Sequence, residues 1–134
     1  MGAHILVVAR ARSRMIDTMN DVIDVPALKD RLEGDRELLK ELVGLYFEDE
    51  QGLIDQIATA VRDGQSEALW RAAHTLKGSV ANFCVPAAHA AAAALETAGR
   101  DGRVGDAPLL FDRLVSELER VRVALRALGA GQDW

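Results

Sequence analysis

Three residues of one short segment have the types and the spacing for chemistry at a helix surface. They are His74, Lys77 and Gly78. At about 100° of rotation per residue they project to one side of a helix. A solvent-facing imidazole is a nucleophile, and a lysine one turn away is placed to hold an anion beside it. Glycine costs a helix roughly 0.5–1 kcal/mol relative to alanine, so we interpret Gly78 as a point of close approach. The pattern favours a histidine that accepts a phosphoryl group from another protein.

The rest of the segment divides between an inward face and this outward one. The apolar residues fall on the inward face, and they are Leu69, Ala72, Ala73, Leu76, Val80 and Phe83. Trp70, Arg71 and Ala81 project with His74, and we expect them to form a partner-docking surface together with Gly78 and the nearby Val85. For Trp70, packing on a neighbouring helix is an equally good interpretation.

The segment His74-Thr75-Leu76-Lys77-Gly78-Ser79 resembles the H-x-x-K-G-[SA] signature of histidine-containing phosphotransfer domains from two-component phosphorelays. The resemblance covers about Val25 to Leu128. Within it, the stretch from Leu38 to Asp49 is similar to the family's first long helix, and Leu95-Glu96 is similar to a Leu-Glu pair on the helix after the histidine.

The resemblance implies a function and a set of partners. His74 would accept a phosphoryl group from a receiver-domain aspartate and pass it to another receiver, while Lys77 stabilises the transferred oxygens. The domain would be a phosphocarrier without its own ATP site, cofactor or metal, and the receiver would bring Mg²⁺. Response-regulator receivers and a hybrid sensor histidine kinase are the implied partners.

Several alternatives stay open. The phosphoaccepting N-terminal domain of a chemotaxis-type kinase is an alternative within the phosphotransfer class, and a helical interaction module without phosphotransfer is a third interpretation. The dimerisation helix of sensor kinases is disfavoured, because Thr75 and Ser79 replace its acidic residue and its proline. Glu96 is placed to accept a hydrogen bond from His74, or to be a surface charge or a structural pair. For His89 a structural role is expected.

Composition favours a single helical domain. Apolar residues make up 49% of the 134 residues and aromatic residues only 4%, which suits closely packed helices. The one cysteine, Cys84, excludes an internal disulfide and a cysteine-cluster metal site, and we expect it to pack as a small apolar residue. A net charge of −5 without a basic stripe argues against nucleic acid. No apolar run reaches the ~20 residues of a membrane span, so we expect a cytoplasmic protein.

Five helices are expected, and they predict an antiparallel four-helix bundle with a short additional N-terminal helix. The short helix starts at Val25 and ends at Gly34. The others run from an Asp35 cap to Gly64, from a Ser66 cap to about Phe83, from Pro86 to about Ala98, and from an Asp106 cap to Leu128; a loop of Gly99, Gly102 and Gly105 precedes the last. The inner stripe of the first long helix is Leu38, Leu42, Leu45, Tyr46, Leu53, Ile57 and Val61.

The chain divides into two parts of unequal character. Residues 1–20 do not follow the helical pattern and are interpreted as an N-terminal arm or a cloning-derived segment, and residues 21–134 as the phosphotransfer domain. Since the four long helices can satisfy one another's apolar stripes, we expect a monomer.

Overall fold

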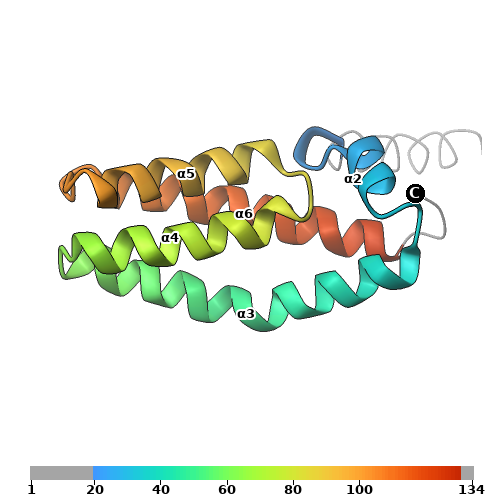
Figure 1. Ribbon diagram of the computed structural model, residues 1–134, viewed down its shortest axis with the longest axis horizontal. Helices are drawn as coiled ribbons and strands as arrows, with labels where there is room; N and C mark the ends of the chain where they lie inside the picture. Colours follow the sequence, from blue (N-terminus) through green and yellow to red (C-terminus); the bar gives the residue numbers. More distant parts are fainter. Residues whose placement is uncertain (1–19, 131–134) are drawn as a thin grey trace, which may run out of the picture.

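The computed structural model describes residues 20–130, so the predicted arm lies outside the described residues except for Asn20. This part of the chain is helical and contains no strand. Residues 20–22 are helical, and the helices that follow are α2 (Val25–Arg31), α3 (Arg36–Arg62), α4 (Ser66–Ala81), α5 (Pro86–Arg100) and α6 (Ala107–Ala130) (Figure 1). None of the described helices is long and apolar enough to cross a membrane.

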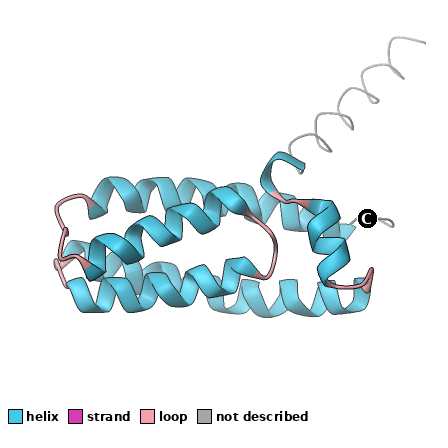
Figure 2. Cartoon of the chain, turned by 45° about the horizontal axis from the view of Figure 1, so that its top comes forward, coloured by secondary structure: helices cyan, strands magenta, loops and turns pink. Residues whose placement is uncertain are grey.

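The four long helices run alternately up and down, and α2 lies across one end of them (Figures 1 and 2). Helices α3, α4, α5 and α6 each pack on two neighbours in the cyclic order α3–α4–α5–α6. Each long helix therefore packs on two neighbours, and the predicted antiparallel four-helix bundle with a short preceding helix is confirmed.

Helix ends follow local chemistry at most positions. Asp24 and Asp35 cap α2 and α3, and the Asp35 carboxylate accepts from the Leu38 amide at 3.0 Å. Ser66 is not the cap of α4: Gln65 occupies that position without a side-chain hydrogen bond, and Ser66 is the first helical residue. The helix also ends at Ala81 rather than Phe83, because the chain must turn towards Pro86, which begins α5.

The core differs from the predicted stripe in the first half of α3. Leu39 is buried there, whereas Leu38 and Leu45 are 37% and 53% exposed. The stripe was predicted on the assumption that α3 is covered along its whole length. With 27 residues against 16, however, α3 extends beyond the end of α4 (Figure 1). Inside the bundle, the buried Glu50 is held by Arg122, which ties α3 to α6.

Gly99 lies within α5 and not in the loop that the sequence suggested. It is buried against α4, and a Cβ at this position would lie 2.7 Å from the Trp70 amide nitrogen and 2.9 Å from the Ser66 carbonyl oxygen. Glycine is thus the residue that lets the two helices approach to backbone contact. Helix α5 ends at Arg100, and the contact places its last turn beside the first turns of α4.

Candidate functional site

His74 lies midway along α4, with 60% of its side chain exposed. The buried residues on the opposite face of α4 determine the direction in which the His74 side chain points. The residues predicted for that face within α4 are all buried: Leu69, Ala72, Ala73, Leu76 and Val80. Rotating α4 to hide the imidazole would bring these residues into water, at about 1.5–3 kcal/mol for each large side chain. The core therefore holds His74 at the surface.

A buried carboxylate from the next helix lies beneath the histidine. Glu96 of α5 is only 4% exposed. Its Oε1 is 3.3 Å from His74 Nδ1 and accepts from Arg100 Nη2 at 2.7 Å. Its Oε2 forms an ion pair with Lys77 Nζ at 2.7 Å. Of the roles left open for Glu96, the structure supports the contact with His74 and the structural pair, and it rules out a surface charge.

The cations around Glu96 keep it ionised in spite of its burial. The contact with Lys77 is the largest cause that lowers the pKa of this carboxyl below its ordinary value; burial opposes it, and His74 adds to the lowering. Lys77 is itself only 28% exposed, and the anion that it holds in this structure is the Glu96 carboxylate. Its ammonium group lies beside the histidine and is paired with Glu96.

The carboxylate also fixes the tautomer of the histidine. An ionised carboxylate only accepts hydrogen bonds, so the neutral imidazole must carry its proton on Nδ1, the atom that faces Glu96 Oε1. The lone pair is then on Nε2, the nitrogen away from Glu96. Burial and pairing of one residue thus make an exposed imidazole a nucleophile at a defined atom.

Gly78 adjoins the histidine on the exposed surface. A Cβ at this position would meet no atom within 4 Å. Packing among the described residues therefore gives no reason for a glycine here, in contrast to Gly99. The prediction that something outside the domain approaches this point is consistent with the open surface.

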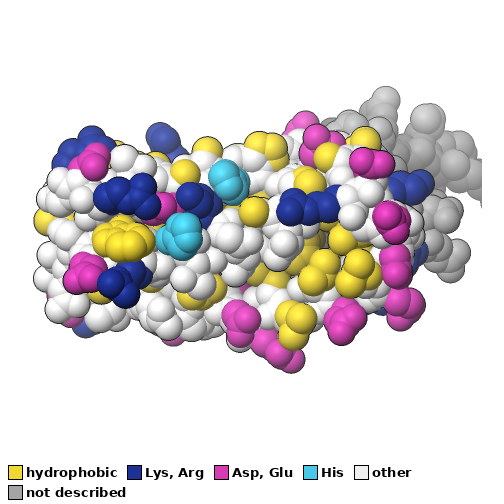
Figure 3. Space-filling model, viewed as in Figure 1, with side chains coloured by type: hydrophobic (Ala, Val, Ile, Leu, Met, Phe, Trp, Pro, Cys, Tyr) yellow, Lys and Arg dark blue, Asp and Glu magenta, His cyan; other side chains and the backbone are white. Residues whose placement is uncertain are grey.

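Trp70 packs on the neighbouring helix, and its part in partner docking stays a prediction. Its backbone is in close contact with Gly99 of α5, as described above, while its half-buried ring lies between two guanidinium groups. Arg71 and Arg100 each lie 5.5 Å from the centre of the ring, a distance suited to cation–π attraction. Figure 3 shows basic, histidine and hydrophobic side chains gathered on this face. Arg71 is also paired with Glu67 at 2.8 Å and Arg100 with Glu96 at 2.7 Å, so the ring contacts two guanidinium groups that each have a carboxylate partner.

The structure corrects other expectations for this surface. Val85 is 2% exposed and cannot contact a partner, because it begins the turn into α5 at the core. Ala81 is half-buried, and its carbonyl accepts from Arg31 at 2.6 Å. His89 is exposed, and its side chain forms no hydrogen bond or ion pair with a described residue, so its side chain gives no support to the structural role expected of it. Cys84 packs at the edge of the core, as expected.

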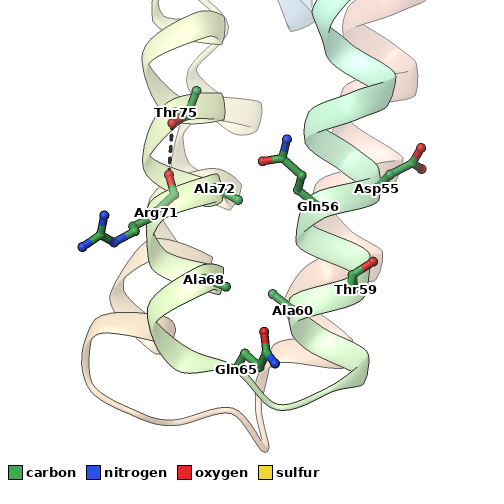
Figure 4. Close-up of a pocket in the computed structure, with 9 residues that line it drawn as sticks. All are labelled: Asp55, Gln56, Thr59, Ala60, Gln65, Ala68, Arg71, Ala72 and Thr75. Carbon is green, nitrogen blue, oxygen red and sulfur yellow. Dashed lines mark hydrogen bonds between the residues drawn. The ribbon is translucent and has the colours of Figure 1, made fainter.

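A shallow groove of about 530 Å³ runs between α3 and α4, on the flank of α4 next to the histidine (Figure 4). Small and polar side chains line it, among them Ala60, Ala68, Thr59 and Thr75, and Arg71 stands at its edge. In residues 20–130, no group of three or more His, Cys, Asp or Glu side chains is arranged to hold a metal ion.

The comparisons with known proteins agree with this geometry. The Hpt domain model matches residues 41–124, which is more than half of the chain. The crystal structure of histidine-containing phosphotransfer protein B from Pseudomonas aeruginosa matches with a TM-score of 0.64 at 24% identity, over 78% of this chain and 88% of that one. No curated protein matches the sequence. The structural match shows the fold, and the domain match shows the family: the chain belongs to the Hpt domains, which carry a phosphoryl group on a histidine and exchange it with the receivers and kinases of two-component systems.

Proposed function

We propose that this domain is a phosphorelay intermediate, in which His74 accepts a phosphoryl group from a receiver-domain aspartate and passes it to a second receiver. One observation supports the role of His74 above all. Its Nδ1 faces a buried, ionised carboxylate while most of its ring is exposed. That arrangement leaves Nε2 as an unprotonated and accessible nucleophile.

The transfer is a displacement at phosphorus. The Nε2 lone pair forms the N–P bond as the bond from phosphorus to the aspartyl oxygen breaks, and the aspartate leaves as a carboxylate. The Nδ1 proton stays in place, so the ring becomes a phosphorylated imidazolium whose charge Glu96 offsets. In the reverse step the ring leaves as a neutral imidazole. Because the Nδ1 proton is retained, the same ring can both accept the phosphoryl group and donate it.

Nearby cations would stabilise the transferred group. The phosphoryl oxygens are anionic, and such transfer depends mainly on positioning and on charge stabilisation. Lys77 and Arg100 both form ion pairs with Glu96, the carboxylate that His74 also contacts. We assign to Lys77 the contact with the phosphoryl oxygens. In this proposal, Mg²⁺ would belong to the receiver.

Docking would use the exposed surface around the histidine. Gly78 offers a point of close approach, Trp70 and Arg71 offer an aromatic and a cationic contact, and Ala81 borders them. A partner with an acidic active site would be attracted to this face, although the whole chain carries a net charge of −5.

The test uses histidine variants of the full chain. Wild type should take up acid-labile label from a phosphorylated receiver, and His74→Gln should lose it while its helical circular dichroism is unchanged. His89→Gln is the matched control and should keep full uptake, because His89 is also exposed but its side chain does not contact Glu96, which pairs with His74. Label retained by His74→Gln would refute the assignment.

A further inference from the structure

The Trp70 ring and the Arg100 guanidinium lie one helical turn away from the contact between His74 and Glu96. Trp70 precedes His74 by four residues on α4, and Arg100 follows Glu96 by four residues on α5. Because the two helices are antiparallel (Figure 1), both steps lead in the same direction along the bundle. His74 Nδ1 faces the Glu96 carboxylate at 3.3 Å, and the Arg100 guanidinium lies 5.5 Å from the centre of the Trp70 ring. The two contacts are therefore neighbouring layers of one helix pair.

Gly99 brings the tryptophan to this position. A Cβ at residue 99 would lie 2.9 Å from the Trp70 Cβ and 2.7 Å from the Trp70 amide nitrogen. Arg100 is the next residue along the chain, so the close approach of the two backbones sets the indole beside the residue that carries the guanidinium. Figure 3 shows basic side chains on two sides of a hydrophobic one, next to a histidine. The contact between Trp70 and Arg100 thus follows from how α4 and α5 pack.

Arg100 and His74 share one oxygen of the Glu96 carboxylate. Oε1 accepts from Arg100 Nη2 at 2.7 Å and lies 3.3 Å from His74 Nδ1. Lys77 pairs with the other oxygen, Oε2, at 2.7 Å. A carboxylate held at one oxygen can still rotate about that contact, whereas contacts at both oxygens fix its plane. Arg100 therefore supplies the second contact, the one that directs Oε1 at the imidazole.

Burial does not hold the arginine in this place. The Arg100 side chain is 59% exposed, and a long exposed cation loses rotamer freedom when it forms an ion pair. The face of the Trp70 ring lies within the range of a cation–π contact. At an exposed site such a contact changes the population of the paired rotamer by about two- to fivefold. The ring therefore favours the one arrangement of the guanidinium that reaches Glu96.

We propose that Trp70 and Arg100 are positioning residues for the phosphoacceptor. The indole ring of Trp70 holds the Arg100 guanidinium against Glu96. The guanidinium in turn keeps Oε1 of Glu96 directed at His74, so that the imidazole proton stays on Nδ1 and the lone pair stays on Nε2. This proposal rests on the proposed function of His74, and it gives Trp70 a role inside the domain that needs no partner.

The first test measures the tautomer of His74 in the unphosphorylated full chain labelled with ¹⁵N. Long-range ¹H–¹⁵N spectra, recorded at a pH where the imidazole is neutral, distinguish a ring nitrogen with a proton from one with a lone pair. Wild type should carry the proton on Nδ1. The ratio of this tautomer to the other should fall about two- to fivefold in Trp70→Leu and further in Arg100→Met, whereas Trp70→Phe, which keeps an aromatic face, should lie between wild type and Trp70→Leu. Unchanged ring signals in Trp70→Leu and Arg100→Met would overturn the proposal.

Arg71 supplies the matched control. Its guanidinium also lies 5.5 Å from the centre of the Trp70 ring, but its carboxylate partner is Glu67, at 2.8 Å. Arg71→Met removes an equal charge from the same ring without removing a contact of Glu96, so the ring signals of His74 should stay as in wild type. If Arg71→Met moved them as Arg100→Met does, loss of nearby positive charge would be the cause, and positioning through Glu96 would be refuted.

A double variant tests whether Trp70 acts through Arg100. Trp70→Leu should lower the tautomer ratio in the wild-type background and have no further effect in Arg100→Met, because residues in one network are not additive. Additive changes would mean that Trp70 reaches His74 by another route and would overturn its role. All variants should keep their helical circular dichroism, because leucine retains the Cβ that packs on Gly99 and Arg100 is exposed.

A small phosphoryl donor separates this proposal from the proposed function. Phosphoramidate should label His74 in wild type without any docking. Its rate of labelling in Trp70→Leu should fall in proportion to the share of imidazoles that carry the lone pair on Nε2. Absence of label in wild type would refute the phosphoacceptor. Label in wild type, with an unchanged rate in a variant whose tautomer ratio has fallen, would refute the positioning role alone.

Discussion

At the scale of single residues, the chemistry of His74 depends on the Glu96 carboxylate, whose position the sequence predicts only in part. Leu95-Glu96 was noted by resemblance, but the burial of Glu96 was not predicted. A signal was present: Glu96 falls four positions after the buried Ala92 and three before Gly99, on the inward stripe of α5. A charged residue on an apolar stripe needs a partner. Which partner it finds depends on how α4 and α5 pack, and spacing within one helix does not give that.

Glu96→Gln should change the reactivity of the phosphohistidine. The amide can still accept from Nδ1 but cannot offset the imidazolium charge of the phosphorylated ring. Uptake of acid-labile label by His74 should therefore be about tenfold slower in this variant than in wild type. A merely structural role would lower the free energy of unfolding and leave the rate of uptake unchanged.

The same carboxyl should contribute to acid unfolding. Because its pKa in the folded chain lies below the ordinary 4.5, its stabilising effect is complete above that pH and is lost as pH falls through the lowered value. Chemical unfolding followed between pH 6 and pH 3 should show a weaker pH dependence for Glu96→Gln than for wild type. Glu67→Gln, at a residue 73% exposed, should follow wild type.

At the scale of elements, two glycines should respond oppositely to the same substitution. Gly99→Ala would drive a Cβ into the backbone of α4; we expect a loss of about 1–3 kcal/mol in the free energy of unfolding, as for overpacked cores. Gly78→Ala meets open surface and should gain roughly 0.5–1 kcal/mol. Urea titrations of both variants measure this, and a destabilised Gly78→Ala would contradict the open-surface interpretation.

Element boundaries were predicted well where local chemistry decides them and poorly where packing does. Asp35 caps its helix as expected, and Pro86 begins α5. The inner face of α4 agrees residue by residue, because a helix packed along its whole length follows its own periodicity. The errors at Leu38, Leu45 and Gly99 have another origin. They depend on the relative lengths and separations of neighbouring helices, which no single helix encodes.

At the scale of the whole molecule, one phenol should report unfolding in alkali. Tyr46 is the single tyrosine, and burial, with a further contribution from Glu50, raises its pKa far above the ordinary value of 10.0. A raised pKa means that stability is complete below pH 10 and is lost as the pH rises above it. Tyrosinate absorbance near 295 nm should appear only together with loss of helical circular dichroism. Titration of the phenol in a fully helical protein would contradict its burial.

The way the histidine is held also bears on how a phosphorylated carrier is recognised. Helix α4 presents His74 from a packed core, and the proton on Nδ1 is already in position before transfer. Little has to move when the phosphoryl group arrives. The phosphorylated and unphosphorylated forms should therefore share one backbone conformation and differ in surface potential. A receiver would then read the signal as electrostatics rather than as shape. The domain can therefore be phosphorylated and dephosphorylated without a change in its fold.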